Sequence, residues 1–72
     1  MTATLPDHAP EWLFGYNRYG CSLRHAKRLP DGQYEVAEYV PAWGGFERWS
    51  CPTADEAEQL MRQRGDVRIN RL

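Results

Sequence analysis

The chain has 72 residues, 42% of them hydrophobic and 26% charged, which is the composition of a folded globular domain and not of a disordered segment. A chain this short supports one hydrophobic core, which excludes a multidomain organisation. Nine lysine and arginine residues against ten aspartate and glutamate residues give a net charge of −1, so the overall charge favours neither nucleic acid nor an anionic membrane. We therefore expect one small domain over residues 11–72.

The first ten residues, MTATLPDHAP, are polar and include two prolines, which is typical of a flexible lead. They lack the basic start and the apolar run of an export signal. No window of the chain approaches the ~20 apolar residues of a membrane span. One pair of cysteines, Cys21 and Cys51, does not make a disulfide framework. The expectation is a cytoplasmic protein with free thiols and no membrane partner.

Strand patterns dominate the first part of the predicted domain. Residues 11–19 (EWLFGYNRY) are rich in aromatic residues and fit either a short strand or a helical turn. Alternation over 21–29 (CSLRHAKRL) predicts a strand. The sequence PDG at 30–32 predicts a tight turn, because proline fixes φ and glycine accepts a positive φ. Residues 33–40 (QYEVAEYV) then form the returning strand of a hairpin.

The rest of the chain predicts a third strand, a helix and a last strand. A turn containing proline and glycine at 41–45 precedes the third strand, 46–51 (FERWSC). Thr53, with a glutamate three residues later, forms a capping box that starts a helix, and Gly65 ends this helix. Residues 66–71 (DVRINR) alternate again and predict a short final strand.

The predicted helix has one apolar face that can pack on the sheet, formed by Ala54, Ala57, Leu60 and Met61. The fold class is therefore α+β, with a three-stranded antiparallel meander followed by one helix and a short final strand. In one of the two alternatives for residues 11–19, an extra N-terminal strand precedes the meander.

The strand register decides which side chains the helix covers. We expect Arg28 to lie opposite Gln33 across the first turn, which makes one face mostly apolar. This face, assigned to the helix, carries Cys21, Leu23, His25, Tyr34, Val36, Val40, Trp49 and Cys51. The opposite face mixes charged and aromatic residues, namely Arg24, Arg28, Glu35, Tyr39, Phe46 and Arg48. A slip of one residue would exchange the two faces of the strand at 21–29.

The sequence contains no recognisable catalytic arrangement. The histidines are His8, in the lead, and His25, in a strand, and neither has a partner at a spacing typical of catalysis. Cys21 and Cys51 lack the close pairing of zinc ligands. The glycines at 44–45 lack the pattern of a phosphate-binding loop. We therefore predict no enzyme activity, no metal site and no cofactor.

Aromatic residues are numerous for so small a chain, with three Trp, four Tyr and two Phe. A core of this size cannot easily hold nine rings, so several should be exposed. They are either half-buried sheet residues or anchors for a partner, since Trp, Tyr and Arg dominate binding hot spots. The predicted partner-binding surface is the face away from the helix, formed by Arg24, Arg28, Tyr39, Phe46 and Arg48 with Trp43 at the adjacent turn.

Three segments resemble a known DNA-binding pattern: GQYE at 32–35, GFERW at 45–49 and TADEA at 53–57. Strands followed by a threonine and an acidic, alanine-containing helix look like the amino-terminal DNA-binding domain of phage integrases and the plant ethylene-response DNA-binding domain. The chain differs from these families in its net negative charge, in Glu35 on the open face and in the strand after the helix. The resemblance implies DNA binding by the open face of the sheet, here Arg24, Arg28, Tyr39 and Arg48.

In size and lack of catalytic motifs the chain is similar, as a class, to small proteins of phages and mobile elements, including inhibitors of the anti-CRISPR type. That similarity implies a non-enzymatic protein that binds and inhibits a host protein or a nucleoprotein complex. The alternative is the sheet-face DNA-binding module implied by the integrase resemblance, with nucleic acid as the partner.

Overall fold

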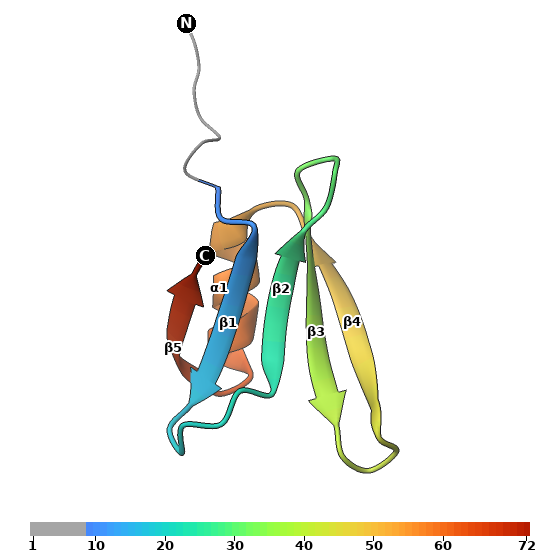
Figure 1. Ribbon diagram of the computed structural model, residues 1–72, viewed down its shortest axis with the longest axis vertical. Coiled ribbons are helices and arrows are strands. Elements are labelled where there is room, and N and C mark those ends of the chain that lie inside the picture. Colours follow the sequence, from blue (N-terminus) through green and yellow to red (C-terminus); the bar gives the residue numbers. More distant parts are fainter. Residues whose placement is uncertain (1–8) are drawn as a thin grey trace, which may run out of the picture.

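The computed structural model describes residues 9–72. It shows an antiparallel five-stranded sheet with one helix packed against one of its faces (Figure 1). The elements in chain order are β1 (Trp12–Asn17), β2 (Arg24–Arg28), β3 (Tyr34–Val40), β4 (Gly45–Cys51), α1 (Ala54–Gln63) and β5 (Asp66–Arg71). The α+β class, the meander, the helix and the final strand are confirmed. Of the two alternatives for residues 11–19, the strand is correct.

The strand order is β4-β3-β2-β1-β5. The first four strands form an up-and-down meander, after which α1 carries the chain back across the sheet and β5 pairs antiparallel with β1 (Figure 1). The backbone N–H groups of Glu11 and Trp12 both donate to the carbonyl oxygen of Leu72, which ties the start of β1 to the end of β5. The helix thus covers one face, and no other described element covers the opposite one.

The lead predicted over residues 1–10 lies outside the described residues except for Ala9 and Pro10. The carbonyl oxygen of Ala9 accepts a hydrogen bond from Nη1 of Arg28 at 2.8 Å, and that of Pro10 accepts one from the Tyr34 hydroxyl. Tyr34 is buried, so its hydroxyl requires such a partner. These bonds hold the chain ahead of β1 against β2 and β3.

The predicted register of the β2–β3 hairpin is wrong by one residue. Arg28 lies opposite Tyr34, not Gln33, because the N–H of Leu29 donates to the carbonyl of Gln33 at 2.7 Å and leaves a three-residue turn between them. Gly32 ends this turn at a φ of 88°, which a side chain would disfavour. As a result His25 lies on the uncovered face, whereas Arg24 and Arg28 lie on the helix side.

The core lies between the sheet and one side of α1. Ala57 and Met61 of the helix are fully buried against Leu13 of β1, Ala26 of β2 and Val36 of β3. Small alanines on both surfaces let the helix approach the sheet closely, and Met61 fills the remaining space between them. With so few large core residues, each makes a large contribution to stability.

Nearby and distant residues stabilise the start of α1, and a glycine follows its end. Oγ1 of Thr53 accepts a hydrogen bond from the N–H of Glu56 at 3.1 Å, which confirms Thr53 as the N-cap of the predicted capping box. Near the start of the helix, the guanidinium of Arg71 in β5 binds Asp55 at 2.9 Å and Glu58 at 2.5 Å. The chain leaves the helix at Gly65, as predicted, with a φ of 122°.

Arg24 is buried between the sheet and the end of α1, where its guanidinium binds two carboxylates. Its Nε and Nη2 donate to the two carboxylate oxygens of Asp66 at 3.0 and 3.3 Å, and its Nη1 donates to Oε1 of Glu38 at 3.0 Å. Glu38 also accepts from Nε of Arg64, whose guanidinium lies 4.5 Å from the centre of the Trp49 ring. Arg24, Asp66, Glu38 and Arg64 therefore form one connected network that links β2, β3, β5 and the end of α1.

A bulge in β5 puts Asp66 in reach of Arg24. The β1–β5 register shifts between Tyr16 and Asn17, so that Val67 is left over and its side chain is 58% exposed while Asp66 is buried. Asp66 lies over Gly15 of β1, where an added Cβ would be only 2.2 Å from Oδ2 of Asp66. A glycine in the middle of β1 is therefore required by the buried ion pair.

Candidate recognition surface

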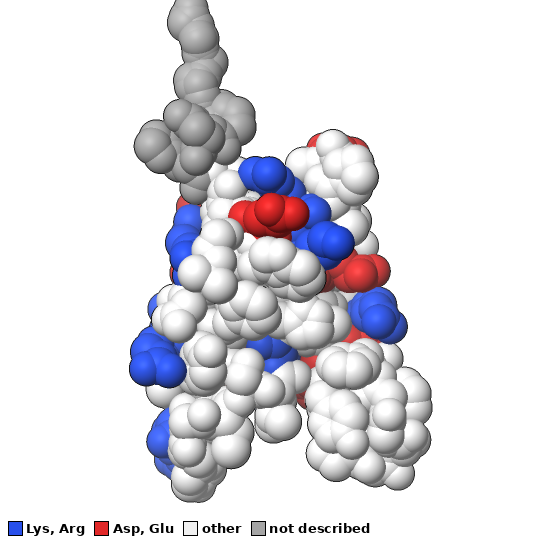
Figure 2. All heavy atoms as spheres, in the orientation of Figure 1, with Lys and Arg blue, Asp and Glu red and all other residues white. Residues whose placement is uncertain are grey.

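The face of the sheet opposite α1 carries a group of aromatic side chains that no described element covers. By the strand register it includes alternate residues of β1 and their partners on the other strands. We call this surface the aromatic face; its rings are Trp12, Phe14, Tyr16, His25, Tyr39 and Phe46. Figure 2 shows this side of the molecule, with uncharged side chains over its centre and charged groups mainly around them.

Five of these rings form a continuous row across the sheet. The centroid distances are 5.7 Å for Trp12 and Phe14, 6.4 Å for Phe14 and His25, 6.0 Å for His25 and Phe46, and 5.6 Å for Phe46 and Tyr39. The tilted and edge-on angles of the last three pairs are favourable for aromatic contacts. The row therefore runs from β1 to β4 and holds its members in fixed positions.

A small residue in the central part of the sheet allows this row to close. Ala37 of β3 points to the uncovered face, opposite His25 of β2 and Arg48 of β4, yet it is only 3% exposed. His25 and Phe46 come from the strands on either side of β3 and meet above it in an edge-on contact. A larger side chain at position 37 would separate these two rings, so Ala37 forms the floor of the row.

The aromatic face has a net positive charge. Among the described strand residues that point to this side, Lys27, Arg48 and Arg68 are cationic and Glu35 is the single carboxylate, a local net charge of +2. The carboxylates of Glu38, Asp66 and α1 lie on the helix side. The aromatic face is therefore locally positive, although the chain as a whole has a net charge of −1.

Each cation of the aromatic face lies over a ring. The ammonium of Lys27 is 5.3 Å from the centre of a Trp12 ring, the guanidinium of Arg48 is 5.8 Å from that of Phe46, and the guanidinium of Arg68 is 4.4 Å from that of Tyr16. These distances are those of cation–π contacts. Arg48 also lies 3.7 Å from Glu35, but both side chains are exposed and the pair contributes little to stability.

His25 lies among the rings of Trp12, Phe14 and Phe46. Burial lowers the pKa of its imidazole, and the positive charge of Arg48 lowers it further. The ring is consequently neutral at pH 7 and adds an aromatic surface to the row instead of a charge. This environment suits packing and gives the imidazole no evident acid–base partner.

The six predicted site residues are divided by the structure. Tyr39, Phe46 and Arg48 lie together on the aromatic face, where Tyr39 and Phe46 are 38% and 40% exposed. Trp43 lies in the β3–β4 turn beside this group, 61% exposed, with its ring over Gly45. The placement of Arg24 and Arg28 on this face is wrong, because the one-residue change of register turns both to the helix side.

The predicted surface lacked the residues that β1, β2 and β5 contribute to the aromatic face. The missing residues are Trp12, Phe14, Tyr16, His25, Lys27 and Arg68. The period-two spacing of Trp12, Phe14 and Tyr16 is the signal that could have found the first three, since alternate residues of a strand share one face. His25 and Lys27 could not be placed without the correct register.

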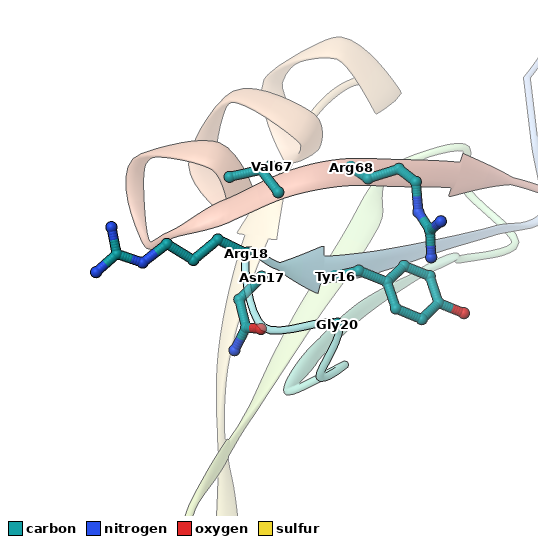
Figure 3. Close-up of a pocket in the computed structure, with 6 residues that line it drawn as sticks. All are labelled: Tyr16, Asn17, Arg18, Gly20, Val67 and Arg68. Atoms are coloured by element: carbon teal, nitrogen blue, oxygen red, sulfur yellow. The ribbon is translucent and has the colours of Figure 1, made fainter.

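A shallow hollow of about 230 Å³ lies where the aromatic face meets the β1–β2 connection. It is lined by Tyr16, Asn17, Arg18, Gly20, Val67 and Arg68. Figure 3 shows Arg68 extending alongside the Tyr16 ring, while Arg18 extends away from both. The hollow thus continues the aromatic face toward a second exposed arginine.

Other kinds of site have less support within residues 9–72. No three His, Cys, Asp or Glu side chains of this part of the chain lie close enough together to hold a metal ion. Cys21 is exposed and Cys51 is buried, and the two are not bonded to each other. The described helix is too short and too polar to cross a membrane.

Comparison of the chain with protein-family models, with curated proteins and with solved structures finds no significant match.

Proposed function

We propose that this chain is a non-enzymatic binding protein whose recognition surface is the aromatic face. The observation that carries the proposal is the unbroken row from Trp12 to Tyr39 on a side of the sheet that no described element covers. Rings of this size are normally used to build a core, which is scarce in so small a chain. Here most of them lie outside it.

Physical properties of the row suit recognition. Aromatic side chains are rigid, so little conformational entropy is lost when a partner covers them, and their burial provides much of the energy of an interface. The contacts among His25, Phe46 and Tyr39 hold the rings in place before a partner arrives. Such preorganisation lowers the entropic cost of binding.

The kind of partner expected from the sequence is a host protein or a nucleoprotein complex that the small protein would inhibit. The aromatic face favours a partner with an anionic surface, because its own net charge is +2. A nucleoprotein complex presents such a surface. The segregation of the carboxylates to the helix side also supports nucleic acid as the second candidate, in line with the sheet-face binding that the integrase resemblance implies.

A paired set of variants tests the recognition surface. Affinity-tagged wild type is used to isolate partners from host lysate, with and without nuclease, beside Tyr39→Ala/Phe46→Ala and a control, Gln59→Ala/Gln63→Ala, on the exposed side of α1. The proposal requires at least one partner that wild type and control retain and the aromatic variant loses. If all three proteins retain the same partners, the recognition surface lies elsewhere.

A further inference from the structure

We propose that the ligand of the aromatic face is a single-stranded nucleic acid, bound by stacking of its bases on the ring row and by pairing of its phosphates with Lys27, Arg48 and Arg68. This inference deepens the proposed function and rests on it. Proteins that bind single strands combine aromatic stacking platforms with a positively charged path for the backbone. The aromatic face joins these two features on a side of the sheet with a single carboxylate among its strand residues.

Charge complementarity favours a polyanion over an ordinary protein surface. The three cations lie on different strands, at β2, β4 and β5, so they surround the row instead of forming one cluster. Each lies against a ring and not in a strong ion pair, since only Arg48 has a carboxylate nearby, at 3.7 Å. Their charges therefore remain available to phosphates that follow the row.

The spacing of the rings favours a single strand over a duplex. Consecutive centroids are 5.6 to 6.4 Å apart, well above the ~3.4 Å between stacked nucleotides of one strand in a double helix. Bases that follow the row must therefore be separated from one another, as in an extended single strand. A duplex exposes only base edges in its grooves, so its base faces cannot reach the rings.

The hollow beside Tyr16, which follows Phe14 on the same face of β1, extends the path for the backbone. Tyr16 and Arg68 belong both to the aromatic face and to the lining of the hollow, and Arg18 stands on its other side (Figure 3). A strand that leaves the row at Phe14 toward Tyr16 would meet the guanidinium of Arg68 next. The path from β4 to the hollow can accommodate several nucleotides, within the range of about 4 to 16 known for single-strand binding domains.

Fluorescence anisotropy with a fluorescein-labelled oligothymidylate of about 12 nucleotides tests this directly, with a duplex of equal length as comparison. If Lys27, Arg48 and Arg68 neutralise three phosphates, affinity should fall on the order of 20-fold between about 50 and 200 mM salt. The full chain is titrated at both salt concentrations. In parallel, NMR spectra of the complex should show shifts at Phe14, His25 and Phe46, on three different strands, and none along α1.

Matched variants separate the aromatic face from general charge. Arg48→Glu and Arg62→Glu change the net charge equally, but Arg62 lies on α1, away from the face. Likewise Phe46→Ala removes a ring of the row, whereas Tyr19→Ala removes an exposed ring from the β1–β2 connection. We expect Arg48→Glu and Phe46→Ala each to weaken binding by about 5-fold or more, and both controls to leave it within about 2-fold.

Several outcomes would overturn the inference. The inference fails if the oligothymidylate does not bind at about 50 mM salt, or if the duplex binds with equal affinity. It also fails if Arg48→Glu and Arg62→Glu weaken binding equally. If the oligonucleotide fails to bind but nuclease-treated lysate still yields a protein that Tyr39→Ala/Phe46→Ala loses, the ligand is a protein and only the proposed function stands. If the aromatic variant also retains every partner, both proposals fail.

Discussion

Burying a guanidinium group is costly unless an opposite charge and hydrogen-bond acceptors replace its water, and Asp66 and Glu38 do this for Arg24. Its side chain is only 6% exposed. The neighbouring positions of β2 give no local sign of this burial, because one carboxylate partner lies 14 residues further along the chain and the other 42. An arginine that looks like part of a binding surface is thus a structural residue.

Removal of Arg24 should reveal this role. Arg24→Met keeps the volume but leaves the carboxylate of Asp66 buried without its partner, so we expect a loss of about 3 to 5 kcal/mol in the free energy of unfolding. Arg48→Met, at an exposed pair with Glu35, should change it by less than about 1 kcal/mol. Urea denaturation followed by circular dichroism measures both. Equal effects of the two substitutions would contradict the buried network.

Gly15 is the complementary case, in which the absence of a side chain matters. In Gly15→Ala the new methyl group would lie 2.2 Å from Oδ2 of Asp66 and 2.7 Å from Cε of Met61. These groups must move, and we expect a loss of roughly 1 to 3 kcal/mol, although alanine is normally better than glycine in a strand. Thermal unfolding tests this; an alanine variant at least as stable as wild type would show that Asp66 does not lie over β1.

At the scale of elements, α1 is held by a few well-placed contacts. The spacing of its apolar residues correctly predicts which side of the helix packs on the sheet. The four residues of that side are not equally buried. Ala57 and Met61 are fully buried, whereas Leu60 and Ala54 pack at the margin of the core. The helix contacts the sheet mainly where both surfaces have small residues, so a single long side chain fills most of the interface.

Substitutions at neighbouring helix positions should therefore differ. Met61→Ala would leave a cavity in the centre of the core, and we expect it to lower the free energy of unfolding by about 2 to 5 kcal/mol. Leu60→Ala should lower it by less, because Leu60 is only partly buried. Denaturant midpoints compare the two directly. A larger effect at Leu60 would mean that the helix is rotated from the position described.

For the molecule as a whole, the charged network on the helix side links the end of α1 to three strands of the sheet. Glu38 accepts hydrogen bonds from Arg64, next to the end of α1, and from Arg24, which binds Asp66 of β5. The hydrogen bond from Arg64, followed by that from Arg24, lowers the pKa of Glu38 despite its partial burial. The network thereby couples global stability to pH.

The sign of this coupling follows from the lowered pKa. Glu38 is more acidic in the folded than in the unfolded chain, so its contribution is complete above the ordinary value of 4.5 and is lost as the pH falls through the folded pKa. Glu38→Gln should cost roughly 1.5 to 3 kcal/mol at pH 7, and the difference from wild type should shrink in acid. Unfolding at a series of pH values measures it. A difference independent of pH would exclude a charged role.

The sequence by itself determined the local structure, because caps, turns and strand alternation depend on residues within a few positions of one another. Thr53, Gly65 and the turn at 30–32 each predict the correct boundary. Tertiary structure alone decided which face of β2 points outward, since one residue in the length of a turn reverses every side chain of the strand. Burial of Arg24 and the gathering of Phe14, His25 and Phe46 into one row both follow from that choice, and both need partners brought from distant strands.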